Sequence, residues 1–526
     1  MNGAQAVVAT LRGCGVEVYF ANPGTSEMHL VAALDEEPTA RAVPCLFEGV
    51  ATGAADGYGR MSGRPAATLL HLGPGLGNGL ANLHNARRAA TPLVNLVGDH
   101  ATHHKQLDAP LESDIDALAG TVSGWVHRCR DTASAGVDTA AAVAAAMTSP
   151  GQVATLILPA DISWSPGASP APPRPSARPS AVPDDAMTAI IAALRSAAPT
   201  AFLLGGTATR APALRAAARI AAATGARLLC ETFPARLERG AGLPALERLG
   251  YLPEGARAQL QGLQHLVLVG AHIPVSFFAY PGQPGLLAPG DCHVHTLAGP
   301  GDDVAGALAH LTDLVPHTAP ATTSAARPQP PTGELTGEAV AAAVGALLPE
   351  GAIVVDEANT SGLWLPAATA GAPQHDWLSL TGGAIGQGLP LAAGAAIACP
   401  GRPVVCLEAD GSAMYTLQAL WTIAREELDV TTVVYANQSY SVLEMEYERL
   451  AQVADSGHRR RASRDLLDLS RPNLNFAELA QGMGVPTSRA TTAEEFTLQL
   501  AKALAEPGPH LIEARVPPLF TLQRTP

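Results

Sequence analysis

Short, strongly apolar segments recur along the 526-residue chain, and each ends in Gly, Asp or Asn before an Ala-rich stretch of helical length. Examples are "EVYFANPG", "PLVNLVGD", "TAFLLGG", "HLVLVGA", "GAIVVDEA", "RPVVCLEADG" and "VTTVVYAN". Continuous apolar runs indicate strands buried on both faces, and helices between them indicate parallel sheets. The pattern therefore predicts an α/β fold of doubly wound parallel sheets. In such sheets, ligands bind beyond the carboxyl ends of the strands.

Two stretches rich in Pro, Ala and Ser have no apolar period and divide the chain. We predict extended linkers over residues 164–184 and 316–334. They separate an N-terminal domain (1–163), a central domain (185–315) and a C-terminal domain (335–526). Because a chain of this length exceeds what one hydrophobic core supports, three doubly wound domains are expected.

Composition excludes several classes of function. The net charge is -14 and only 15% of residues are charged, so nucleic-acid binding is not expected. The one basic cluster, His458–Arg461, is interpreted as a solvated loop. Seven scattered cysteines form no CxxC and no Cys/His metal spacing, which argues against a disulfide framework or a zinc site. We find no signal peptide and no apolar run of about 18 residues, so a cytoplasmic protein without a membrane span is expected.

Polar residues end two successive predicted strands in "PVVCLEADGSAMYTLQALWTIAREELDVTTVVYANQ". We predict a strand over 403–409 that ends at Asp410, a helix over 414–428, and a strand over 430–436 that ends at Asn437. If the strands are parallel neighbours, about 4.8 Å apart, the two side chains share one rim. Carboxylate and amide oxygens suit Mg²⁺, and the backbone N–H groups of Gly411 and Ser412 suit a phosphate. Ordinary turn chemistry explains the same residues equally well.

This segment resembles the thiamine diphosphate motif, which begins Gly-Asp-Gly and ends Asn-Asn with similar spacing. The resemblance implies that Asp410, Asn437 and the main-chain oxygen of Ser439 bind Mg²⁺. It also implies that the cofactor lies against Gly411, Ser412, Asn437, Tyr440 and Ser441.

The chain departs from that motif at two supporting positions. Ala409 replaces its first Gly and Ala436 its first Asn, and neither position supplies a metal ligand. The substitution at Ala409 leaves open whether the backbone there takes the family's conformation. Upstream, "LTGGAIGQGLPLAAGAAIA" resembles the segment that meets the aminopyrimidine. By that match, the carbonyl of Gly383 accepts from the exocyclic amino group, and Ile385 is the apolar wedge that bends the cofactor.

A second site feature lies in the N-terminal domain. In "VPCLFEGVATGAADGYGR", Glu48 follows an apolar run and begins an Ala/Gly-rich helix. Thiamine chemistry needs a carboxylic acid in a water-poor place, where it shares a proton with the pyrimidine ring. A Glu at a helix start is otherwise a dipole-favoured surface residue. Because "EGVATGAADGYGR" resembles the family's segment around its catalytic Glu, we assign that role to Glu48. The stretch "GPGLGNG" does not satisfy GxGxxG, and no FAD motif is evident in the central domain.

Two further segments resemble benzoylformate decarboxylase. "FANPGTSEM" places Thr25 where that enzyme has a substrate-contacting Ser, and "LLHLGPGLGN" places His71 where it has an acid/base His. The alternative for His71 is a structurally bonded histidine. That enzyme's second active-site His has no match; the aligned region offers Phe277 or Phe278, which could line an apolar pocket.

The loop "GDHATHHKQLDAPLESD" carries His100, His103, His104 and Lys105 after a predicted strand. It could bind a substrate carboxylate or be a solvated rim, and the residues leave both open. Six side chains are candidates for the substrate pocket by position: His100, His104, Phe277, Phe278, Leu443 and Glu446.

Over its whole length the chain resembles the superfamily of benzoylformate decarboxylase and the acetolactate synthase large subunit. The resemblance implies a thiamine diphosphate- and Mg²⁺-dependent decarboxylation of a 2-oxo acid through an enamine, which is released as an aldehyde or passed to a carbonyl acceptor. An acetolactate synthase-like carboligase is the alternative, although Pro110-Leu111 replaces that enzyme's Phe-Gln pair. A non-catalytic thiamine diphosphate-binding scaffold is a remote third. A homodimer with interfacial active sites, paired into a homotetramer, is also implied.

Overall fold

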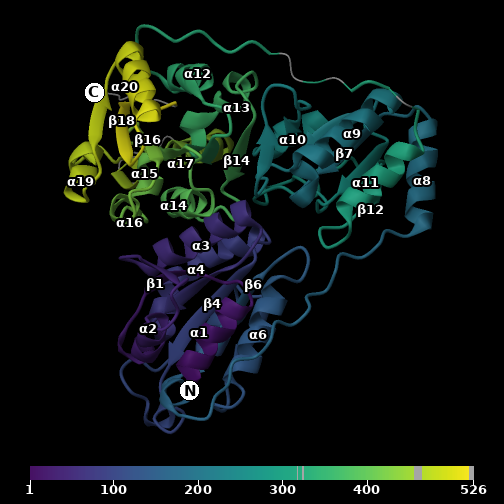
Figure 1. Ribbon diagram of the computed structural model, residues 1–526. Helices are drawn as coiled ribbons and strands as arrows, with labels where there is room; N and C mark the ends of the chain where they lie inside the picture. Colours follow the sequence, from purple (N-terminus) through teal and green to yellow (C-terminus); the bar gives the residue numbers. More distant parts are fainter. Residues whose placement is uncertain (317, 321, 323–324, 455–464, 520–526) are drawn as a thin grey trace.

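The computed structural model of the chain describes residues 1–526 except 317, 321, 323–324, 455–464 and 520–526. Three α/β lobes, each built on its own sheet, are arranged around a common centre (Figure 1). The three parallel-dominated sheets confirm the predicted fold class. The basic run His458–Arg461 lies outside the described residues. None of the described helices combines the length and apolar character that a membrane span requires.

The N-terminal sheet has six parallel strands in the order β2-β1-β3-β4-β6-β5. Neighbouring residues point to opposite faces: Phe20 and Leu70 pack with α3, α4 and α5, whereas Tyr19 and Leu69 pack with α1, α2 and α6. Burial on both faces explains the continuous apolar runs. The elements are α1 Gly3–Gly13, β1 Val18–Asn22, η1 Thr25–Glu27, α2 Met28–Leu34, β2 Arg41–Pro44, α3 Glu48–Ser62, β3 Ala66–Leu70, α4 Leu72–Arg88, β4 Leu93–Asp99, η2 Lys105–Leu107, α5 Ile115–Gly120, β5 Trp125–Arg128, α6 Ala135–Ala146, β6 Val153–Pro159 and α7 Ala160–Trp164.

The central sheet has five parallel strands in the order β10-β8-β7-β11-β12. Phe202 packs with α8, α9 and α11 on one face, and Leu203 packs with α10 on the other. The elements are α8 Asp184–Arg195, β7 Thr200–Leu204, η3 Gly206–Thr209, α9 Ala211–Thr224, β8 Arg227–Cys230, β9 Leu237–Arg239, β10 Glu247–Arg248, α10 Pro253–Leu260, β11 His265–Val269, β12 His293–Ala298 and α11 Val304–Asp313.

The C-terminal sheet has seven strands in the order β17-β18-β16-β15-β13-β14-β9. Its edge strand β9 comes from the central part of the chain and pairs antiparallel with β14, an exchange between domains that the sequence pattern does not signal. The elements of this lobe are α12 Gly337–Leu347, β13 Ile353–Glu357, η4 Asn359–Gly362, α13 Leu365–Ala368, β14 His375–Ser379, α14 Gly388–Ala398, β15 Val404–Ala409, α15 Asp410–Ala413, α16 Ala419–Arg425, β16 Val430–Ala436, α17 Ser441–Ala454, α19 Phe476–Gly482, β17 Thr487–Ala490, α20 Ala493–Ala505 and β18 His510–Arg515.

The helix predicted over 414–428 is wrong in its extent. Residues 410–413 form the short α15, and α16 begins only at Ala419. Between them, the Thr416 hydroxyl donates to the carbonyl of Gly386, 2.8 Å away. This contact with a distant segment replaces a helical turn that the apolar period alone favoured.

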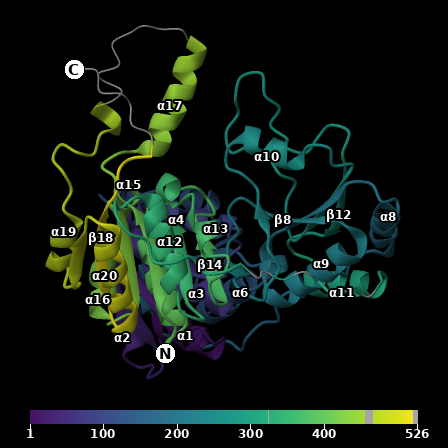
Figure 2. The same cartoon turned by 90° about the horizontal axis from the view of Figure 1, so that it is seen from above.

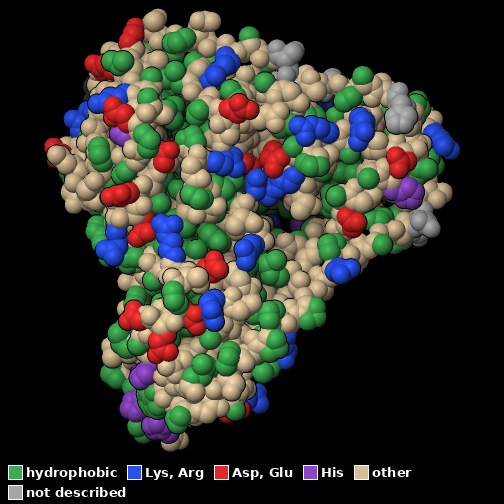
Figure 3. Space-filling model, in the orientation of Figure 1, with side chains coloured by type: hydrophobic (Ala, Val, Ile, Leu, Met, Phe, Trp, Pro, Cys, Tyr) green, Lys and Arg blue, Asp and Glu red, His purple; other side chains and the backbone are tan. Residues whose placement is uncertain are grey.

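Helices α3 and α14 join the N-terminal and C-terminal lobes (Figure 1). The approach is close: a Cβ on Gly394 would lie 1.8 Å from the carbonyl oxygen of Ala54, and one on Gly57 would lie 2.1 Å from that of Leu391. On the face seen in Figure 3, acidic and basic side chains are interspersed.

Candidate cofactor and active site

Asp410 and Asn437 lie on one rim of the C-terminal sheet. Strands β15 and β16 are parallel neighbours, with Ala409 opposite Tyr435, so their carboxyl ends coincide. The Asp410 carboxylate accepts from the backbone N–H of Gln438 (2.6 Å) and from that of Gly411 (2.8 Å). Burial raises the pKa of Asp410 to about 6, and these N–H donors oppose that rise.

The oxygens at this rim fit a hard cation with a diphosphate. The Asn437 amide oxygen accepts from the N–H of Ser439 at 2.9 Å, and its lone pairs are not exhausted by that bond. The hydroxyls of Ser439 and Ser441 are buried and have no partner among the described residues. No group of three His, Cys, Asp or Glu side chains suited to a metal occurs in the described part of the chain. A site here would rest on one carboxylate, one amide oxygen, main-chain oxygen and phosphate, as Mg²⁺ accepts.

The substitution at Ala409 leaves the backbone unstrained. Ala409 has φ -76° and ψ 145°, a conformation open to any residue, so no glycine is needed there. Ala436 is buried as the last residue of β16. The backbone that leads to Asp410 therefore needs no glycine at position 409.

A loop that the sequence analysis missed closes this end of the site. In η4, Asn359 adopts φ +51°, which Asn tolerates better than most residues. Its amide donates to the Ser412 hydroxyl at 3.0 Å, and Ser361 accepts from the Asn437 amide at 3.1 Å. "DEANTSG" carries no recognisable motif, because its role depends on contacts with residues 50 to 80 positions away.

The turn over residues 382–388, here called the pyrimidine wall, carries Gly383 and Ile385. Gly383 has φ +74° and Gly386 has φ +91°, conformations that favour glycine. From α4, the Asn85 amide donates to the carbonyl of Ala384 at 2.8 Å and accepts its N–H at 3.2 Å. Ile385 is half-buried, so part of its side chain is free to meet a ligand.

The buried carboxyl group of Glu357 supports the wall, and that of Glu408 lies beside it. The N–H of Gly386 donates to Glu357 at 2.7 Å, and the N–H of Gly388 donates to the other carboxylate oxygen. Burial raises the pKa of Glu357 to about 7, opposed by these N–H donors. Burial and the charge of Glu357 raise the pKa of Glu408 well above its usual range.

Glu48 occupies the predicted place at the start of α3. Its side chain is only 6% exposed, and one oxygen accepts from the Asn78 amide at 2.9 Å. A Cβ on Gly75 would lie 3.3 Å from the other oxygen and 3.3 Å from the Cβ of His71. Glu48 and His71 therefore flank the same glycine in α4.

His71 is held by a carboxylate that the sequence analysis did not identify. Its Nδ1 lies 2.8 Å from the fully buried Glu27 and 3.2 Å from the Ser26 hydroxyl. Leu72, which follows, has φ +49°, a conformation that is rare for leucine and typical of constrained sites. Thr25 is exposed in η1, so the hydroxyl beside the imidazole is that of Ser26. In the sequence, the one feature that could have identified Glu27 is its place beside Ser26 in "NPGTSEM".

The aromatic candidates gather beside the wall. A Cβ on Gly383 would lie 2.6 Å from the Cζ of Phe277, whose ring also contacts Phe233, Tyr251 and Phe278. Glu446 in α17 accepts from the Tyr280 hydroxyl at 3.2 Å. Leu443 is exposed nearby in sequence on the same helix. Figure 2 shows α17 and α10 rising on the same side of the molecule, and an Arg449–Glu254 ion pair of 2.9 Å joins them.

The cationic loop after β4 is largely engaged with its own acidic neighbours. Lys105 pairs with Glu112 and, at 3.3 Å, with Asp99. The rings of His100 and His104 lie 5.5 Å apart, and the Nε2 of His100 is buried with no partner among the described residues. For His100 and His104, substrate binding stays a prediction. The charge of Lys105 is already neutralised by its acidic neighbours.

Comparison with known proteins identifies the family of the chain. A profile described as "Thiamine pyrophosphate enzyme, N-terminal TPP binding domain" matches residues 1–120, and its C-terminal counterpart matches residues 360–514. A Mycobacterium tuberculosis protein, provisionally named acetolactate synthase large subunit IlvX, is 62% identical over 520 residues, covering 99% of this chain and 100% of the relative. The chain belongs to the thiamine pyrophosphate enzyme family. The recognition made from the motifs is thereby confirmed.

More distant relatives of this thiamine pyrophosphate enzyme include decarboxylases. Benzoylformate decarboxylase of Pseudomonas aeruginosa is 28% identical over 532 residues, 96% of both chains. A solved Rhodococcus jostii thiamine diphosphate-dependent 4-hydroxybenzoylformate decarboxylase has a TM-score of 0.85 at 24% identity, covering 98% of this chain and 99% of that one. Benzoylformate decarboxylase from Polynucleobacter necessarius has a TM-score of 0.83 at 22% identity, covering 99% and 100%. These two structures establish the shared fold.

The two cofactor-binding domains of this thiamine pyrophosphate enzyme carry complementary groups. The N-terminal domain holds the buried acid Glu48, and the C-terminal domain holds Asp410, Asn437 and the pyrimidine wall. Each group lies at the carboxyl end of a strand or at the start of the following helix. That is where an open parallel sheet binds ligands.

Proposed function

We propose that the protein is a carboligase that decarboxylates a 2-oxo acid and transfers the decarboxylated unit to a carbonyl acceptor, with thiamine diphosphate and Mg²⁺ as cofactors. The observation that carries the thiamine chemistry is Glu48, a buried carboxyl group at the start of α3 that accepts from the Asn78 amide at 2.9 Å. The transfer step is supported by the 62% identical relative named as an acetolactate synthase large subunit. Benzoylformate decarboxylase is less similar, at 28%, so the comparisons favour the synthase-like alternative over the decarboxylase-like interpretation.

The chain's residues divide the work between binding and proton transfer. Thiamine diphosphate, when bound, supplies the nucleophilic carbon and accepts the electron pair left by CO₂. Asp410, Asn437 and the main-chain oxygen of Ser439 would hold Mg²⁺ against the diphosphate. Glu48, which is buried, would meet the pyrimidine nitrogen and exchange a proton with it in a place with little water. The wall at Gly383 orients the ring from the other side.

The active unit that we propose is a homodimer with active sites at the subunit interface. It rests on the family resemblance alone, as does the pairing of dimers into a tetramer. Within one chain, α3 runs alongside the pyrimidine wall: the Asn82 amide donates to the carbonyl of Gly49 at 2.8 Å and lies 3.3 Å from the carbonyl of Gly386.

A simple decarboxylase is the second candidate. It is favoured by His71, whose imidazole is held by Glu27 and Ser26 and could deliver a proton to the decarboxylated unit. Phe277, an apolar ring against the wall, favours transfer over protonation, because it offers no proton at that side.

A panel of 2-oxo acids, with thiamine diphosphate and Mg²⁺, tests both candidates. CO₂ release would be measured together with aldehydes and 2-hydroxy ketones. We expect ketone products, such as acetolactate from pyruvate; aldehyde alone would favour the decarboxylase. Glu48→Gln should lower CO₂ release at least about 10²-fold while the cofactor still binds. Glu338→Gln, an exposed acid in the first turn of α12, is the matched control. Unchanged CO₂ release in Glu48→Gln would contradict the mechanism.

A further inference from the structure

Glu357 lies directly beneath the pyrimidine wall. It is the last residue of β13, only 2% of its side chain is exposed, and both carboxylate oxygens face the turn. One oxygen accepts the N–H of Gly386 at 2.7 Å, and the other accepts the N–H of Gly388. A single side chain thus satisfies two N–H groups of the turn.

The carboxylates of Glu357 and Glu408 leave no room for a side chain at Gly388. A Cβ on Gly388 would lie 3.0 Å from the carboxylate of Glu357 and 2.0 Å from that of Glu408. Gly386, with φ +91°, is in a conformation that the N–H bond to Glu357 helps to hold. The turn over residues 382–388 is therefore held by its hydrogen bonds to the Glu357 carboxylate, and a shift of that carboxylate would shift the turn.

Glu357 also reaches the diphosphate end of the site. The Ser412 side chain lies close enough to this carboxylate to lower its pKa, and Ser412 follows the predicted metal ligand Asp410 by two residues. The Ser412 hydroxyl accepts from Asn359 of η4 at 3.0 Å. The carboxylate therefore bonds to the wall that would face the pyrimidine and lies beside the loop that would face the diphosphate.

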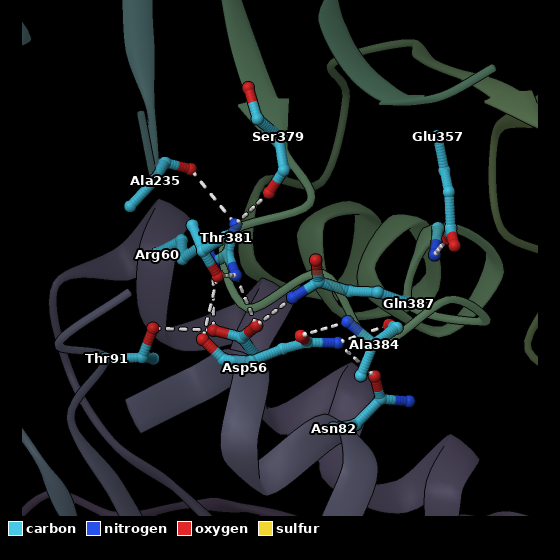
Figure 4. Close-up of polar contacts among 12 residues, drawn as sticks. Asp56, Arg60, Asn82, Thr91, Ala235, Glu357, Ser379, Thr381, Ala384 and Gln387 are labelled. Carbon is cyan, nitrogen blue, oxygen red and sulfur yellow. Dashed lines mark hydrogen bonds and ion pairs between the residues drawn. The ribbon is translucent and has the colours of Figure 1, made fainter. Parts of the chain in front are cut away.

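The opposite side of the wall is clamped from the N-terminal domain (Figure 4). The Gln387 amide donates to Asp56 at 2.7 Å, and the Asn82 amide lies 3.3 Å from the carbonyl of Gly386. These contacts hold the turn against α3 and α4, but none of them reaches the diphosphate loop. Two others connect the turn with that side of the site: the Thr416 hydroxyl donates to the carbonyl of Gly386 at 2.8 Å, and Glu357 lies beside Ser412.

We propose that Glu357 is a positioning residue that sets the pyrimidine wall at a fixed distance from the diphosphate loop, so that both ends of thiamine diphosphate are met at once. This inference rests on the proposed cofactor site. It predicts that loss of Glu357 weakens binding of the whole cofactor more than binding of its diphosphate part alone. A residue that merely stabilised the domain would weaken both equally.

The test compares Glu357→Gln with Glu513→Gln. Glu513 is fully buried in β18 of the same sheet, where it accepts the N–H of Ala477 at 3.0 Å and pairs with Arg489 and Arg515, so it matches Glu357 in burial. With Mg²⁺ present, dissociation constants for thiamine diphosphate and for inorganic diphosphate would be measured by calorimetry on the full chain. Apo melting temperatures and the near-ultraviolet circular dichroism of the bound cofactor would be recorded alongside.

We expect Glu357→Gln to weaken thiamine diphosphate binding about 10-fold, with inorganic diphosphate binding within about 2-fold of wild type and an altered dichroism of the bound cofactor. Glu513→Gln should change neither constant. Glu357→Asp, which keeps the charge but is shorter, should lie between wild type and Glu357→Gln, and it replaces that variant if the latter does not fold. Equal losses for both ligands, or no loss, would overturn the inference. Wild type that binds no thiamine diphosphate would overturn the proposed function as well.

Discussion

Replacing Asp56 by Ala tests whether α3 is held to the pyrimidine wall by a buried charge pair. Asp56 is fully buried and accepts from Arg60 twice, at 2.9 and 2.6 Å. It also accepts from the Thr91 hydroxyl at 2.5 Å and from the Gln387 amide at 2.7 Å (Figure 4). The Arg60 side chain is only 1% exposed. Without Asp56, the positive charge of Arg60 would remain buried among neutral oxygens.

Removing one partner of such a pair costs about 3–5 kcal/mol, because the other charge is left uncompensated. For a chain of this length, the same loss lowers the melting temperature by about 3–5 °C if the chain melts as one unit. Asp56→Ala combined with Arg60→Met leaves no buried charge, so the double variant should cost at least about 2 kcal/mol less than the sum of the single variants.

The free energies of unfolding of wild type, both single variants and the double variant would be measured by urea denaturation, which completes a double-mutant cycle. Fluorescence and circular dichroism would be followed in parallel to check that the transitions coincide. A cost below about 1 kcal/mol for Asp56→Ala, or additive single costs, would refute the argument that the pair is dry and coupled.

Two further predictions concern the active site. Because Asp410 must be ionised to bind a cation and its pKa lies at about 6, the apparent Mg²⁺ affinity should fall about tenfold between pH 7 and pH 5, as measured by calorimetry with thiamine diphosphate in excess; a flat profile would exclude Asp410 as a ligand. Glu27→Gln removes the charge beside His71, and we expect turnover to fall about 10²-fold while the dissociation constant of thiamine diphosphate is unchanged; a parallel loss of cofactor affinity would show that Glu27 is only structural.

Much of the scaffold could be predicted because its signals are local. Continuous apolar runs revealed buried parallel strands, and β16 spans Val430–Ala436 as its pattern indicates. Asp410 and Asn437 share a rim because topology forces neighbouring parallel strands to end together. Glu48 begins α3 because an apolar strand gives way there to an Ala/Gly-rich helix. In each case, residues close in sequence decide the outcome.

The parts that were missed depend on contacts between distant segments. Glu357 looked like the polar end of one more strand, yet its partners lie about 30 residues later in the pyrimidine wall. Thr416 gives up a helical turn to reach the same wall, and strand β9 leaves its own domain to complete the sheet beneath it. These three features converge on a turn whose glycines cannot hold their conformation by themselves. The predicted diphosphate end is centred on one motif and completed by the η4 loop, whereas the wall is held by contacts from several distant segments, so we expect substitutions that disable cofactor binding to concentrate around the wall.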